Sequence, residues 1–177
     1  MLAHHIPAAR LAELVTQEAS LAVDVRCADL PRLAEIAARG AAGSELPVRV
    51  RVRFRAGAEG FPLVCIEAQG AISLVCQRCL APVDYPLDIR ANLTAIADEP
   101  RTAELASPFD SILLDTDGGL PLMAVVEDEI ISALPLAPRH LRAADCRSDV
   151  VKRDVWAPGE SVSRPFAGLA GRVLRGR

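Results

Sequence analysis

Apolar and polar residues alternate strictly through residues 46–57, LPVRVRVRFRAG. The apolar set is Val48, Val50, Val52 and Phe54, and the polar set is Arg49, Arg51, Arg53 and Arg55. Because successive side chains of a strand point to opposite faces, this pattern predicts a strand with one apolar face and one arginine face. Similar patterns predict a strand at 20–27, two in 61–76 broken near Gly70, and one at 82–96. The short turns between them indicate a mostly antiparallel sheet.

Helices are predicted at 7–19, at 29–39 with Gly40 ending the helix, and at 120–134. In the last segment, apolar residues recur every four positions, and an acidic triplet fills the other side. The triplet is Glu127, Asp128 and Glu129. Residues 109–115 form a further strand candidate. The sequence therefore predicts an α+β fold with a mostly antiparallel sheet and a long helix in its C-terminal half.

The length of 177 residues favours one domain. We expect a single α+β domain at 1–146 and an extended or disordered tail at 147–177. Residues 1–137 carry 11 basic and 19 acidic side chains, whereas residues 138–177 carry 9 basic and 4 acidic ones. A basic tail on an acidic body is typical of a nucleic-acid or partner contact, and equally of a solvated tail. No apolar run approaches the roughly 18 residues of a membrane span, and no secretory signal opens the chain, so we expect a cytoplasmic protein.

The stretch LVCQRCLAP places Cys76 and Cys79 at the spacing C-x-x-C. With His140 and Cys146 as further ligands, the pair could form a closed Cys3His zinc site of the structural kind. Two other interpretations stay open: reduced cysteines without a metal, and a redox dithiol. A redox dithiol usually lies at a helix N-terminus, which the following prolines oppose here. A disulfide hairpin is disfavoured by a reducing compartment and by the odd number of five cysteines.

The arginine face could contact RNA phosphates, or it could be a solvated sheet face that is ion-paired to neighbours such as Glu67 or Asp88. The acidic triplet cannot converge on one ion, because successive helical residues point in different directions. We therefore expect it to be solvated or to face a partner. We find no phosphate-binding loop and no nucleophile elbow. The sequence predicts neither an enzyme nor a small-molecule substrate.

Four features in order resemble the YceD family, the large ribosomal RNA subunit accumulation proteins: CQRCLAPV (76–83), LPLMAVVEDEIISALPLAPRH (120–140), Cys146 and RPFAGLAGR (164–172). The resemblance implies a non-enzymatic factor for accumulation or processing of large-subunit rRNA, with rRNA or a ribosomal protein as partner. The positions that it brings into play are Cys76, Arg78, Cys79, Glu127, Asp128, Glu129, Pro135, His140 and Cys146.

Within that resemblance, we expect Arg78 and the acidic triplet to be partner-binding. The arginine face is not part of the family pattern, so an RNA contact there would be particular to this protein or a close group. Two alternatives stay open. One is a thiol-disulfide oxidoreductase using Cys76 and Cys79, and the other is a zinc-stabilised adaptor without a ribosomal role.

Overall fold

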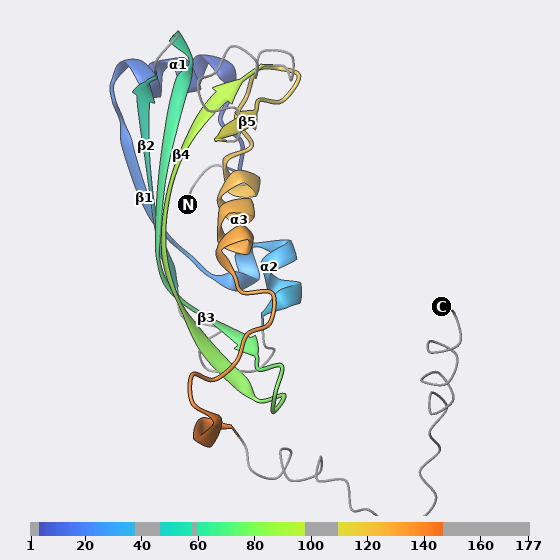
Figure 1. The fold of residues 1–177 in the computed structure, drawn as a ribbon. Coiled ribbons are helices and arrows are strands. Elements are labelled where there is room, and N and C mark those ends of the chain that lie inside the picture. The colour runs from blue at the N-terminus through green and yellow to red at the C-terminus, as the bar shows by residue number, and fades with distance from the viewer. Residues whose placement is uncertain (1–3, 38–46, 58–59, 98–109, 147–177) are drawn as a thin grey trace, which may run out of the picture.

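A computed structural model describes residues 4–37, 47–57, 60–97 and 110–146 of the protein. A five-stranded sheet with the order β1-β2-β3-β4-β5 forms its centre (Figure 1). The first four strands pair antiparallel, and β4 pairs with β5 in parallel. The strands are β1 (Ser20–Val25), β2 (Val48–Ala56), β3 (Pro62–Val75), β4 (Pro82–Ile96) and β5 (Ser111–Leu113). The predicted α+β arrangement with a mostly antiparallel sheet is thus present.

Strand β2 has the two faces that its alternation predicts. Its four apolar side chains are almost fully buried in the main core, whereas Arg49, Arg51 and Arg55 are exposed and Arg53 is half-buried. The core face of the sheet continues on β3 through Val64 and Ile66. One face of the sheet therefore builds the core, and the other carries the arginines.

Strand β3 runs unbroken through Gly70, so the expected division of 61–76 into two strands is wrong. Gly70 instead marks the point where β2 stops pairing with β3, since the last β2 partner on β3 is Gln69. A Cβ at Gly70 would lie 3.1 Å from Val48 Cα and 3.3 Å from the Pro47 carbonyl oxygen. Glycine thus permits a close strand contact rather than a chain break. Beyond it, β3 and β4 continue as a two-stranded ribbon.

The helices are α1 (Ala8–Thr16), α2 (Pro31–Ile36) and α3 (Leu122–Ala133), with short 3-10 turns at η1 (Cys27–Asp29) and η5 (Ala143–Asp145). Figure 1 shows α2 and α3 side by side on the concave side of the curved sheet, with α1 across its upper end. Helix α3 has 12 residues and is shorter than the predicted helix at 120–134. No helix in the described ranges is long and apolar enough to cross a membrane.

The acidic triplet does not share one solvated side of α3. Glu127 is only 5% exposed. Its carboxylate accepts a hydrogen bond from the Leu33 backbone N–H at 2.9 Å and another from Arg32 Nε at 3.1 Å. Asp128 stays exposed and pairs with Arg32, while Glu129 is half-buried. Glu127 is therefore not solvated, and its carboxylate fastens α3 to the first turn of α2.

Candidate metal centre

The two cysteines of the C-x-x-C pair lie in the tight turn that joins β3 to β4, at the tip of the ribbon. We call this turn, residues 76–81, the cysteine knuckle. The Cys76 N–H donates to the Ala81 carbonyl at 2.9 Å, and the Leu80 N–H donates to the Cys76 carbonyl at 2.8 Å. Leu80 adopts a left-handed backbone conformation with φ 57°. These bonds turn both thiols inward, where Cys76 and Cys79 are buried.

The second pair of candidate ligands comes from the segment after α3. We call residues 135–146, from Pro135 to Cys146, the ligand strap. The Gln77 N–H of the knuckle donates to the Pro138 carbonyl at 2.8 Å, which seats the strap beside the knuckle. The η5 turn then brings Cys146 back toward the β3–β4 tip. Prolines keep the strap extended, so His140 and Cys146 reach one point despite the intervening residues.

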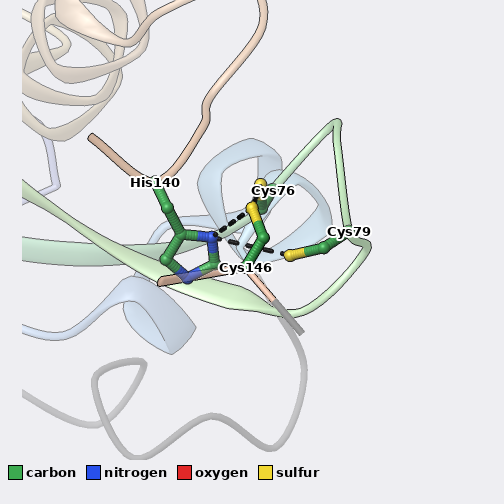
Figure 2. Close-up of side chains that lie close together, drawn as sticks. All are labelled: Cys76, Cys79, His140 and Cys146. Carbon is green, nitrogen blue, oxygen red and sulfur yellow. Dashed lines mark hydrogen bonds between the residues drawn. The ribbon is translucent and has the colours of Figure 1, made fainter. Parts of the chain in front are cut away.

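Figure 2 shows the three sulfurs and the imidazole turned toward one another. His140 Nδ1 lies 3.5 Å from Cys79 Sγ and 3.5 Å from Cys146 Sγ. Cys76 Sγ lies 3.9 Å from Cys146 Sγ, and all four ligand atoms lie within 4.8 Å of one another. All five cysteines of the chain are free thiols. The structure thus brings together the four residues that the sequence singled out.

This arrangement fits a tetrahedral zinc ion. With Zn–S bonds of about 2.3 Å and Zn–N bonds of about 2.0–2.1 Å, tetrahedral ligand atoms lie roughly 3.5–3.8 Å apart. The two nitrogen–sulfur distances of 3.5 Å and the sulfur–sulfur distance of 3.9 Å are close to that spacing. Three sulfurs and one imidazole favour zinc among the common divalent metals, and four protein ligands close the coordination shell. A closed site of this kind supports structure, because it leaves no position for a substrate.

The pKa of one thiol, that of Cys76, favours a metal as well. Burial raises the pKa of Cys76, but hydrogen bonds from the backbone of Arg78, His140 and Cys79 outweigh it and lower the pKa to about 5. Burial raises the pKa of the Cys146 thiol. The neighbouring thiols raise this pKa further, whereas the Arg78 guanidinium lowers it. Metals bind thiolates, and the knuckle therefore holds one sulfur in the required form at neutral pH.

Arg78 joins the knuckle to the strap. Its Nε donates to Cys146 Sγ at 2.9 Å, and its Nη2 donates to the carbonyls of His140 at 3.2 Å and Arg142 at 3.0 Å. A zinc ion with three thiolates and a neutral imidazole would carry a net charge of −1, which the guanidinium offsets. The family resemblance implies a partner-binding role for Arg78, and within the chain its bonds hold the candidate ligands in place.

The arginine face lies on β2, in the part of the sheet where β1, β2, β3 and β4 pair side by side, on the other side of Gly70 from the two-stranded ribbon. Arg51 and Arg53 both pair with Glu67 on β3, as one of the two interpretations predicted. Arg49 pairs with Asp24 on β1, whereas Asp88 accepts from Gln69. Of the two neighbours suggested from the sequence, Glu67 pairs with part of the arginine set, whereas among the described residues Asp88 pairs with none of it. Within the described ranges, Arg55 has no ion-pair partner.

A second group of residues of the types that can bind a metal was not predicted from the sequence. His5 Nε2 lies 3.2 Å from an Asp115 carboxylate oxygen and 3.6 Å from one of Asp117. All three side chains are substantially exposed, as is common for groups that bind no ion. The isolated bridge between Ile6 and Leu120 brings these distant segments together. No local spacing in the sequence signals that contact.

Fold and cluster together define a small α+β protein with a closed, candidate structural metal centre. The family described as "Large ribosomal RNA subunit accumulation protein YceD" matches residues 64–171, and the chain belongs to that family. The Haemophilus influenzae protein with the same description is 29% identical over 107 residues, which cover 59% of this chain and 61% of that relative. The match thus spans less than two thirds of the relative. No solved structure matches the chain. The resemblance on the knuckle and α3 motifs is confirmed.

Proposed function

We propose that the protein is a non-enzymatic factor for large ribosomal subunit biogenesis, which promotes accumulation or processing of large-subunit rRNA in the cytoplasm. The family match over residues 64–171 carries the proposal, because it includes the knuckle, α3 and the ligand strap. The factor binds rRNA, a large-subunit ribosomal protein, or both. Exposed Asp128 suits a basic protein partner, and the arginine face suits RNA.

We further propose that Cys76, Cys79, His140 and Cys146 hold one structural zinc. When bound, the ion crosslinks the β3–β4 tip to the strap that follows α3. Arg78 holds the strap against the knuckle, and backbone hydrogen bonds of the knuckle stabilise the Cys76 thiolate. The supporting observation is the match between the sulfur and nitrogen spacings and tetrahedral geometry.

Depletion of the protein from cells tests the function. The ratio of large- to small-subunit rRNA and the sucrose-gradient profile are measured with and without the intact protein. We expect a selective loss of large-subunit rRNA that the intact protein restores. Rescue with Cys76→Ser and Cys79→Ser then shows whether the thiols matter. An unchanged ratio with normal subunit peaks would sink the ribosomal proposal.

The low pKa of Cys76 favours one rival, a thiol-disulfide oxidoreductase. Its burial opposes that role, because an attacking thiolate must meet its substrate. An insulin-reduction assay separates the two proposals. Turnover that is lost in Cys76→Ser, together with normal rRNA on depletion, would support the rival.

A further inference from the structure

Three large exposed apolar side chains lie on the cysteine knuckle and on the strap that is hydrogen-bonded to it. Leu80 on the knuckle is 69% exposed, and Leu136 and Leu141 on the strap are 105% and 102% exposed. Ile36 and Leu136 also line a groove of about 170 Å³ with Gln77 of the knuckle. Large apolar side chains exposed together on a folded protein mark a contact surface more often than isolated ones do.

Leu80 provides a second sign of selection for contact. Its φ of 57° lies in the left-handed region, which glycine and asparagine adopt far more readily than leucine. Its side chain gains little burial within the protein at this position. The tight turn of the knuckle sets this conformation, and an exposed leucine is an unusual residue to occupy it.

The charge around these leucines selects the class of partner. Arg139 and Arg142 flank Leu141 and are exposed, and no ion pair joins either of them to another described residue. Asp145 of η5 is the acidic residue of the strap, whose two arginines outnumber it, and Asp128 and Glu129 lie elsewhere, on α3. Beyond Cys146 the sequence stays basic, with seven basic and three acidic residues over 147–177. A basic ribosomal protein would be repelled here, whereas a polyanion would be attracted.

We propose that the knuckle surface, formed by Leu80, Leu136, Arg139, Leu141 and Arg142, binds single-stranded RNA, such as the loop of a hairpin. The two arginines contact phosphates, and the leucines pack against the faces of unstacked bases. A regular RNA duplex hides those faces, so the apolar contacts require a loop or a single strand. The inference rests on the proposed function and names its RNA-binding surface. The metal centre underneath fixes the two segments that carry the surface.

Fluorescence anisotropy with labelled transcripts tests the inference on the full-length, zinc-loaded protein. The probes are hairpin-containing fragments of large-subunit rRNA, and fully paired versions of the same fragments serve as comparison. Arg139→Glu with Arg142→Glu removes the charge, and Leu136→Ser with Leu141→Ser removes the apolar contacts. Leu80→Asn keeps the left-handed turn while removing its apolar side chain. Matched controls are Arg10→Glu on α1 and Leu113→Ser on β5, which are also exposed.

We expect the arginine variant to bind loop RNA at least about tenfold more weakly. Its plot of log K against log salt should be shallower by roughly 1.4, because each phosphate contact on a single strand contributes about 0.7. The leucine variants should bind loop RNA about fivefold or more weakly than the wild type. Their salt slope should be unchanged, since base contacts release no counterions. The controls should bind like the wild type. Far-UV circular dichroism and zinc content confirm that each variant is folded.

Several outcomes would overturn the inference. The first is an equal loss of RNA affinity in the control variants, or an unchanged RNA affinity in the knuckle variants. The second is preference for the fully paired probes. The third is a wild type that binds no rRNA fragment, or that binds a ribosomal protein through this surface instead. If the wild type still restores large-subunit rRNA in depleted cells, the proposed function stands without this surface. If depletion leaves rRNA normal, the proposed function fails by itself.

Discussion

Replacing Glu127 by alanine is expected to destabilise the fold by about 2–4 kcal/mol. The carboxylate is 5% exposed and accepts the buried Leu33 N–H at 2.9 Å and Arg32 Nε at 3.1 Å. Alanine leaves the Leu33 N–H without a partner, which costs about 1–3 kcal/mol. Loss of the charge-assisted bond to Arg32 adds about 1 kcal/mol, discounted because the guanidinium is half exposed. Against a typical stability of about 5–15 kcal/mol, this is a large change.

Urea unfolding followed by circular dichroism measures the effect. Glu127→Gln should cost less, about 1–2 kcal/mol, because its amide oxygen still accepts the Leu33 N–H while the ionic contact to Arg32 is lost. Asp128→Asn is the matched control: this carboxylate also contacts Arg32 but is exposed, so its loss should cost under about 1 kcal/mol. A Glu127→Ala variant within about 0.5 kcal/mol of wild type would refute the proposed fastening of α3 to α2.

Three further predictions concern the candidate metal centre. Untagged protein should contain about one zinc per chain, and chelation should lower its Tm; under about a tenth of an equivalent would rule out the site. Arg78→Met should weaken zinc binding by about 10–100-fold in competition with a chelator, whereas unchanged affinity would assign Arg78 another role. In metal-free protein, the pKa of Cys76 is about 5, against 9.0 for an ordinary thiol. Because the folded-state pKa lies below the unfolded-state pKa, the ionised thiol stabilises the fold fully above pH 9. This contribution shrinks as the pH falls and is gone once the pH is below 5. The unfolding free energy of wild type should therefore drop toward that of Cys76→Ser between pH 8 and pH 5, and a constant difference would contradict the assignment.

The sequence predicted the parts of the structure that depend on local periodicity. The alternation in β2 depends only on the two faces of a strand, and both faces appear as expected. Cys76 and Cys79 share one turn, so their convergence also follows from local geometry. Their meeting with His140 and Cys146 was anticipated from the chemistry of zinc, which needs four ligands.

The failures have a common cause, which is contact between segments far apart in the sequence. Glu127 looked like a solvated residue because its buried partner, the Leu33 N–H, lies 94 positions away. Gly70 looked like a strand break, but the close approach of Val48 explains it. His5 meets Asp115 only because the Ile6 bridge brings the N-terminal segment to the turn. Neither periodicity nor composition carries that information.

The two-stranded ribbon beyond Gly70 limits how the length of this protein can change. The knuckle lies at its tip, and each residue pair in the ribbon advances the tip by about 3.4 Å. One added pair would also turn every later side chain to the opposite face, so the cysteines would point away from the strap. Two added pairs would restore the facing and move the tip by about 7 Å. The ribbon can therefore change length only by an even number of residue pairs if the cysteines are to keep facing the strap. The strap must then change length by the same distance.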